Sequence, residues 1–157
     1  MGNIEFLMNE DEEEIEVSDL IKNVAYSELK IVSVNVWYTD KRQIAVIQVI
    51  YFNGKEFFMG NKTANITGDM EKETLELEEG DYIKNIMGSF SKKGAIEFLA
   101  FNSIKGKAKQ FGKEIMNGLN FTFGVTRRER PICISGFTFF DGNYWRINKL
   151  VLDVTYL

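Results

Sequence analysis

From residue 31 to the end of the chain, apolar and polar side chains follow a period of two that is interrupted at glycines. Every second residue of the segment 31–38 is apolar, which is typical of a strand with one buried face. Residues 44–52 are almost continuously apolar, so we expect a strand that is buried on both faces. Shorter segments of the same kind predict further strands at residues 56–59, 74–77, 81–88, 96–101, 118–124, 132–137 and 150–154.

Glycine and proline usage supports the same class of fold. Asn53-Gly54 lies between two strand segments and is the pair best suited to a tight hairpin turn, because it tolerates positive φ. The chain has one proline, and glycines often stand at segment ends, as in folds of many short antiparallel strands. A helix would fit only residues 105–116, and we do not expect one there. The pattern predicts an all-β domain, either a sandwich or a barrel-like arrangement.

The first 22 residues differ from the rest of the chain. Residues 9–14 form a block of like charge, with apolar residues on both sides. Such a block is typical of a solvated arm, whereas the apolar flanks would allow the segment to dock on its own domain or on a partner. We therefore divide the chain into an acidic N-terminal arm, residues 1–22, and a domain, residues 23–157.

Short blocks spread over residues 25–157 carry a resemblance to one protein family. Residues 75–77 and 80–88 are similar to the segment L-x-L-x-x-(G/S)-E-Y-I-x-x-V-x-G, with Asp81 in place of Glu. Further blocks match in order at residues 58–62, 66–68, 99–103, 110–112, 118–123, 134–137 and 145–150. The chain thereby resembles the jacalin-related lectins. This resemblance implies the fold β-prism I, in which three antiparallel sheets form the domain, with sugar bound by loops at one end and no metal.

The resemblance also implies which residues would contact the sugar. In the family, a G-x-x-x-D loop ends in an aspartate that accepts hydrogen bonds from sugar hydroxyls, a task that suits a carboxylate. Asn148 is interpreted as the matching residue, although it follows Gly142 by six positions instead of four. The loop is then two residues longer than in the family, and Asp141 could supply a carboxylate from another direction. Asn143 lies in the same loop.

Aromatic residues complete this candidate site. Tyr144 and Trp145 would form a flat platform for a sugar ring, or else one or both pack inside the domain. In the family a second loop often carries a stacking aromatic; Ala95 falls at about its place, with Phe90 as a substitute. In the family a third binding loop is rich in glycine, and residues 24–29 correspond to it in this chain. They contain no glycine, so close approach of the backbone to a ligand is less easily arranged. Two of the three loops depart from the family pattern, which predicts a degenerate sugar site.

Composition and charge narrow the classes of function. The 157 residues are the size of one domain, and a net charge of −4 argues against nucleic-acid binding. No apolar run approaches the roughly 20 residues that cross a bilayer, and no signal peptide is recognised, so we expect a cytoplasmic protein without membrane insertion. The chain has no His and one Cys, which excludes His-based triads and Cys-rich zinc sites. We expect no enzyme activity, no metal and no cofactor.

Two functions remain open from the sequence. The first is a lectin-like domain without catalytic activity that binds a carbohydrate or glycoconjugate through residues 141–148, with help from residues 89–95. The second is an intracellular protein-interaction or assembly subunit built on a β-prism that no longer binds sugar. The resemblance and the aromatic pair Tyr144-Trp145 support the first function, which we place first. The absence of a recognised signal peptide, the altered loops and the acidic arm support the second, and a homo-oligomer is compatible with both.

Overall fold

A computed structural model describes residues 2–4, 15–17, 29–39, 42–113 and 118–156. Within these ranges the chain forms twelve β-strands, and no helix there is long and apolar enough to cross a membrane. The strands are β1 (Gly2–Ile4), β2 (Ile15–Val17), β3 (Lys30–Tyr38), β4 (Ile44–Phe52), β5 (Phe57–Met59), β6 (Glu71–Glu76), β7 (Ile83–Phe90), β8 (Ile96–Ser103), β9 (Ala108–Gly112), β10 (Leu119–Gly124), β11 (Glu129–Phe140) and β12 (Trp145–Tyr156). The predicted all-β class is confirmed.

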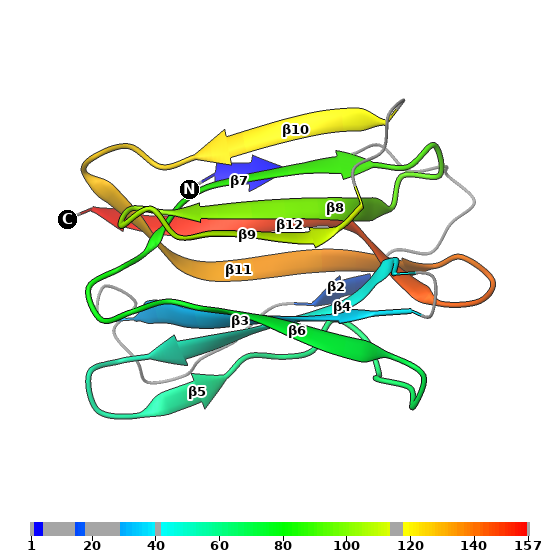
Figure 1. Ribbon diagram of the computed structural model, residues 1–157, viewed down its shortest axis with the longest axis horizontal. Coiled ribbons are helices and arrows are strands. Elements are labelled where there is room, and N and C mark those ends of the chain that lie inside the picture. The colour runs from blue at the N-terminus through cyan, green and yellow to red at the C-terminus, as the bar shows by residue number, and fades with distance from the viewer. Residues whose placement is uncertain (1, 5–14, 18–28, 40–41, 114–117, 157) are drawn as a thin grey trace.

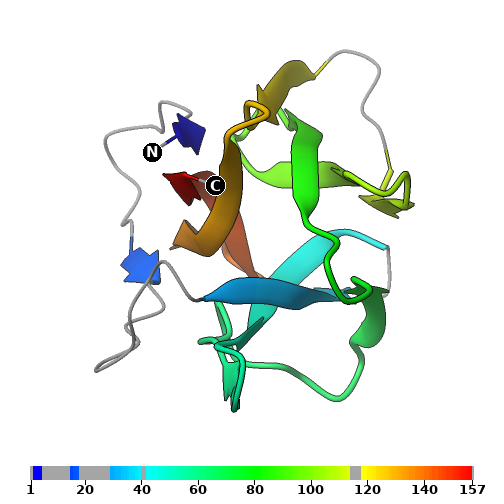
Figure 2. The same cartoon turned by 90° about the vertical axis from the view of Figure 1, so that its left-hand side faces the viewer.

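The strands form three antiparallel four-stranded sheets (Figure 1). Their orders are β1-β12-β11-β2, β10-β7-β8-β9 and β5-β4-β3-β6. Figure 2 looks nearly along the strands, and the sheets lie on three sides of a common centre. This is the β-prism I arrangement, which confirms the predicted fold.

The core lies where the inner faces of the three sheets meet. In β3 the alternating residues Val34, Val36 and Tyr38 are buried in it, as the period of two predicts. The first six residues of β4 are all buried, because the outer face of this sheet is covered as well. There Trp37 packs with Ala45, and the connection from β5 to β6 adds further apolar contacts. The expectation that residues 44–52 are buried on both faces holds for most of the strand.

The hairpin between β4 and β5 forms around Asn53-Gly54. The Asn53 side-chain oxygen accepts hydrogen bonds from the backbone N–H groups of Lys55 and Glu56, both at 2.8 Å. Gly54 has φ +97°, a conformation that glycine adopts without strain. The residue pair predicted to turn the chain therefore does so, by the expected backbone geometry.

Part of the N-terminal segment belongs to the prism. β1 pairs with β12 through Gly2↔Leu152 to Ile4↔Leu150, and β2 pairs with β11 through Val17↔Gly136 to Ile15↔Thr138. Both strands fall within residues 1–22, which the sequence analysis set apart as an arm. The acidic block at residues 9–14 lies outside the described residues, and so does the loop at residues 24–29 apart from Leu29.

No helix forms in the described part of residues 105–116, as expected, and residues 108–112 form β9. This strand pairs with β8 from Phe98↔Gly112 to Asn102↔Ala108 and forms the edge of its sheet. The last two strands, β11 and β12, are longer than the segments 132–137 and 150–154 that the apolar pattern predicted. Their ends carry polar or aromatic residues, and these ends position the site.

Candidate functional site

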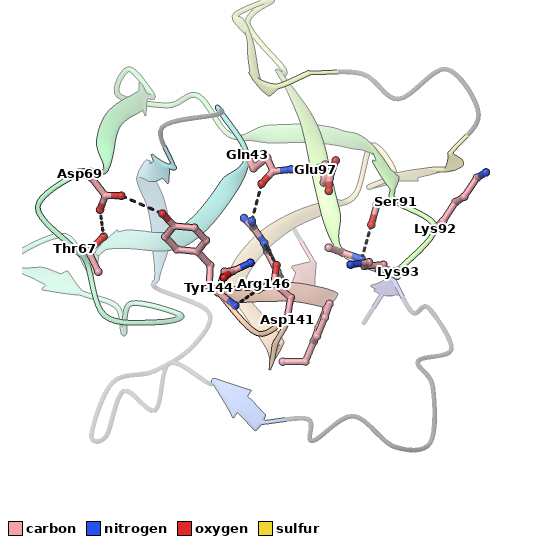
Figure 3. Close-up of a pocket in the computed structure, with 13 residues that line it drawn as sticks. Gln43, Thr67, Asp69, Ser91, Lys92, Lys93, Glu97, Asp141, Tyr144 and Arg146 are labelled. Carbon is pink, nitrogen blue, oxygen red and sulfur yellow. Dashed lines mark hydrogen bonds and ion pairs between the residues drawn. The ribbon is translucent and has the colours of Figure 1, made fainter.

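One end of the prism carries a polar pocket of about 840 Å³, which we call the loop-end pocket. The β7–β8 and β11–β12 connections and the start of β4 meet there, and the β5–β6 connection closes one side (Figure 3). The pocket is lined by Gln43, Thr67, Asp69, Ser91, Lys92, Lys93, Ala95, Glu97, Phe139, Asp141, Asn143, Tyr144 and Arg146. These segments are far apart in the sequence, and the closing of three sheets around one core brings them together.

Asp141 organises the β11–β12 loop. Its Oδ1 accepts hydrogen bonds from the backbone N–H groups of Asn143 and Tyr144, both at 2.8 Å. Its own backbone N–H donates to the Tyr144 carbonyl at 3.0 Å, and Gly142 supplies the positive φ of +102° that the turn requires. Both the side chain and the backbone of Asp141 therefore hold the loop.

Arg146 fills the base of the pocket and ties the loop to β4. Its Nε lies 2.9 Å from Asp141 Oδ2, Nη2 donates to Gln43 Oε1 at 2.7 Å, and Nη1 donates to the Ile44 carbonyl at 3.2 Å. The Arg146 side chain is only 6% exposed. A buried guanidinium needs such partners, because an uncompensated charge would be expensive to bury. Arg146 follows Gly142 by four positions, where the family pattern places its aspartate.

Two carboxyl groups of the pocket have opposite pKa shifts. Burial opposes ionisation of Asp141, but the N–H groups of Tyr144 and Asn143 and the Arg146 guanidinium outweigh it and lower the pKa of Asp141. Burial raises the pKa of Glu97, partly offset by the charge of Arg146 and reinforced by that of Asp141. Asp141 is thus a firmly ionised structural group. Glu97 is the carboxyl whose charge state responds to mild acidification.

Tyr144 forms a wall of the pocket. Its hydroxyl donates to Asp69 Oδ2 at 3.1 Å, and Thr67 donates to the other carboxylate oxygen of Asp69 (Figure 3). The guanidinium carbon of Arg146 lies 5.2 Å from the Tyr144 ring centroid, within the range of a cation–π contact. These contacts fix the ring between the β5–β6 connection and the base of the pocket.

The β7–β8 connection is a tight turn on the opposite side. The backbone N–H of Ser91 donates to the Ala95 carbonyl at 2.8 Å, and Ala95 N–H donates to Ser91 Oγ at 3.3 Å. Lys92 and Lys93 occupy the exposed tip of this turn, and Lys92 points outward (Figure 3). Two ammonium groups therefore stand at the rim of the loop-end pocket.

The structure places the eight candidate residues in different surroundings. Four of them line the loop-end pocket: Ala95, Asp141, Asn143 and Tyr144. Gly142 shapes the loop without lining the pocket, and Trp145 lines a separate cavity. Phe90 is buried and packs on Phe121 at a centroid distance of 5.0 Å, so it presents no face to this pocket. Asn148 is fully buried as well.

Sequence reasoning did not single out nine lining residues: Gln43, Thr67, Asp69, Ser91, Lys92, Lys93, Glu97, Phe139 and Arg146. Four of these, Ser91, Lys92, Lys93 and Arg146, nevertheless lie within residues 89–95 and 141–148, the two loops predicted to bind the sugar. One of them carried a signal, because Arg146 stands at the family spacing of four from Gly142. Gln43, Thr67, Asp69, Glu97 and Phe139 lie outside both loops and join the pocket only through the sheet packing. Among the described residues, no group of three or more His, Cys, Asp or Glu side chains is arranged to hold a metal ion.

This arrangement suits recognition of a polar molecule with several hydroxyl groups. The pocket combines carboxyl, ammonium, hydroxyl and amide groups with the apolar surface of Phe139 and Ala95. Polar groups at fixed positions orient such a ligand, and apolar patches contact its carbon skeleton.

Comparisons with known proteins place this geometry in context. The family model of the Jacalin-like lectin domain matches residues 12–150. No curated protein has a significant match to the chain. Among solved structures, a mannose-specific jacalin-related lectin from Morus nigra in complex with mannose superposes with a TM-score of 0.70 at 14% identity, covering 98% of this chain and 93% of the lectin.

Two further structures show the same fold. A prostate-specific WGA16 glycoprotein lectin has a TM-score of 0.67 at 18% identity, with 99% of both chains covered. Frutalin from Artocarpus incisa, in complex with galactose, has a TM-score of 0.66 at 20% identity, covering 89% of this chain and 98% of frutalin. The shared prism and the match of the family model over most of the chain confirm the resemblance seen in the sequence. The chain belongs to the jacalin-like lectin domain family.

Proposed function

We propose that the domain is a lectin that binds a carbohydrate in the loop-end pocket and catalyses no reaction on it. The observation that carries the proposal is the pocket itself: a polar cavity of about 840 Å³ between the β7–β8 and β11–β12 connections of a jacalin-like lectin domain. Lectins of the same fold are described in complex with mannose and with galactose. A cavity of this size accommodates a small sugar.

The ligand contacts we propose differ from the family pattern. Both carboxylate oxygens of Asp141 are engaged with the loop and with Arg146, so Asp141 serves as a positioning group. The task of accepting hydrogen bonds from sugar hydroxyls then falls to Glu97. Its carboxyl lines the pocket, and a charged acceptor makes the stronger bond to a hydroxyl. Asn143 and Lys93 would contact the sugar from either side.

The same contacts argue for binding without hydrolysis. Glycoside hydrolysis uses two carboxyl groups on either side of the scissile bond. In the loop-end pocket, Asp69 is hydrogen-bonded to Tyr144 and Thr67, and Asp141 is paired with Arg146. Glu97 is left as a single carboxyl available to a ligand.

The test is calorimetric titration with mannose and galactose, comparing the wild type with Glu97→Gln. The glutamine has the same shape but lacks the charge, so we expect affinity to fall about tenfold. Glu79→Gln is the matched control, since Glu79 is exposed in the β6–β7 turn at the other end of the prism. The wild type should also bind more weakly as the pH falls through the raised pKa of Glu97, because protonation removes the acceptor charge.

Absence of binding of both mannose and galactose to the wild type at millimolar concentration would overturn the proposal. If the wild type and Glu97→Gln bound the sugar with equal affinity, the proposal of sugar binding would stand, but Glu97 would not be a ligand contact. These two results separate the function from the residue assigned to it.

A second candidate function, assembly with another protein chain, is favoured by one observation. Phe57 and Met59 on the edge strand β5 are 69% and 67% exposed, and exposed apolar edges promote association. Sedimentation velocity over a range of concentrations tests whether the chain self-associates through this edge. Phe57→Lys with Met59→Lys should then yield monomers, and an unchanged sedimentation profile would remove this edge from consideration.

A further inference from the structure

A second cavity of about 610 Å³ lies beside the loop-end pocket, and we call it the Trp145 cavity. It is lined by Lys62, Thr63, Ala64, Asn65, Ile66, Thr138 and Trp145. None of these residues lines the loop-end pocket. The fold thus builds two cavities at the β11–β12 loop, and the proposed function uses one of them.

The two cavities lie on opposite sides of one ridge. Tyr144 faces the loop-end pocket and its neighbour Trp145 faces the other cavity, since successive side chains near the start of a strand point to opposite faces. The β5–β6 connection is divided in the same way, with Thr67 and Asp69 on one side and residues 62–66 on the other. The hydrogen bond from Tyr144 to Asp69 at 3.1 Å joins the two segments into the ridge.

The Trp145 cavity has the chemical composition of a sugar subsite. The Trp145 ring is partly exposed, and Phe140 packs beside it at a centroid distance of 5.6 Å and so restrains its orientation. Thr63 Oγ1 accepts a hydrogen bond from Ile47 N–H at 3.0 Å, which leaves its hydroxyl hydrogen to donate to a ligand. The exposed side chain of Asn65 offers both donors and an acceptor.

We propose that the Trp145 cavity is a second carbohydrate subsite, in which a hexose ring stacks on Trp145 and hydrogen-bonds to Thr63 and Asn65. The proposal rests on carbohydrate binding in the loop-end pocket. An oligosaccharide that crosses the ridge then occupies both cavities at once. Joining two binding units in one ligand makes the second contact intramolecular, so oligosaccharides bind more tightly than their single units.

Tryptophan fluorescence tests the subsite directly. The chain has two tryptophans, and Trp37 packs with Ala64 and Lys62, which line the Trp145 cavity. Trp37→Phe keeps an aromatic ring in this place and leaves Trp145 as the single reporter. Titration of this variant with mannose or galactose oligosaccharides should change the emission of Trp145 with a saturable dependence on ligand. Saturable calorimetric binding of the same ligand with no change in emission would overturn the subsite while leaving the proposed function intact.

Affinity ratios give a second, independent readout. Trp145→Ala should weaken oligosaccharide binding about tenfold and leave monosaccharide binding at the loop-end pocket unchanged, while Trp145→Phe should recover part of the loss. Asn65→Ala should also weaken binding of the oligosaccharide, and it leaves the core unchanged because Asn65 is exposed. Tyr156→Ala, at the far exposed end of β12, is the matched aromatic control. The proposal of a second subsite is wrong if Trp145→Ala and Asn65→Ala bind the oligosaccharide as tightly as the control. The proposed function itself fails if neither the wild type nor any variant binds a sugar.

Discussion

The charge pair Asp141–Arg146 decides the shape of the β11–β12 loop. The ion pair is short, at 2.9 Å, and its two side chains are 19% and 6% exposed. In such surroundings a charge-assisted hydrogen bond contributes more than on an open surface. Since each partner also bonds to the backbone, the pair links the loop conformation to the start of β4.

Acid titration should separate Asp141 from Glu97, two of the three carboxyl groups that line the loop-end pocket. The pKa of Asp141 is lowered by folding, so the unfolded chain binds the proton more readily and the stability from Asp141 is lost as the pH falls below about 4. The pKa of Glu97 is raised, so its folded form binds the proton more readily and stability falls as the pH rises through this pKa. Urea unfolding between pH 3 and pH 7 measures both, on the wild type and on Asp141→Asn and Glu97→Gln.

The two variants should differ from the wild type in opposite senses. At neutral pH, Asp141→Asn should cost about 1–2 kcal/mol in the free energy of unfolding, and this deficit should shrink on acidification. The free energy of unfolding of the wild type should rise relative to that of Glu97→Gln as the pH falls. Parallel pH profiles for all three proteins would contradict the assigned pKa directions.

Individual residues of the site could be predicted from the sequence only in the two loops that the resemblance identified: Ala95 in one, and Asp141, Asn143 and Tyr144 in the other. Asp141, Asn143 and Tyr144 were found because the resemblance pointed to one short segment. Arg146 was not selected, because the chemistry of a sugar acceptor directed attention to Asn148, which the structure buries. Glu97 carried no signal at all. It reaches the pocket through the register of β8 against its neighbours, which a single sequence does not reveal.

At the scale of elements, the end of β9 depends on one glycine. Gly112 has φ +78°, and a Cβ at this position would lie 2.2 Å from the Glu97 carbonyl oxygen. Its N–H donates to the Tyr38 hydroxyl at 3.0 Å. The close approach of β9 to β8 therefore needs a residue without a side chain at position 112. The backbone it approaches is that of Glu97, whose carboxyl we assign to the ligand.

Gly112→Ala should destabilise the protein more than Gly54→Ala. Both positions have positive φ, which costs an alanine about 1–2 kcal/mol, but nothing lies within 4 Å of a Cβ at Gly54. The clash with the Glu97 backbone should add about 2 kcal/mol or more at Gly112. Urea unfolding of both variants measures the difference, and sugar titration should show weaker binding for Gly112→Ala alone. Equal losses of stability would mean that β8 shifts away at no cost.

The strands themselves were predictable to different degrees. Alternation identified β3, and a continuous apolar run identified β4, because burial of these two strands is strong and local in the sequence. β9 was not among the predicted strands, since it is a five-residue edge strand in which only Phe111 is a buried large apolar residue. Edge strands gain their conformation from one neighbour, here β8, and so leave little pattern in their own residues.

At the scale of the whole molecule, the prism is closed by its N-terminal segment. β1 and β2 are the two edge strands of the sheet β1-β12-β11-β2. Because β1 and β2 pair with β12 and β11, these two strands are part of the domain, although the charge pattern of residues 1–22 is typical of an arm. Charge patterns report solvation of side chains, whereas strand addition uses the backbone, and the two can coexist in one segment.

Deletion of residues 1–22 tests this closure. Without β1 and β2, the sheet consists of β11 and β12 alone, and both strands have an unpaired edge. We expect a loss of about 2 kcal/mol or more, which lowers Tm by about 5 °C, and concentration-dependent association at the new edges. Calorimetry and light scattering measure the two effects. Glu16→Pro in the full-length chain is the matched control: it disturbs the pairing of β2 with β11, leaves β1 in place and should give an intermediate Tm. A truncated protein with wild-type Tm that stays monomeric would make residues 1–22 a solvated arm.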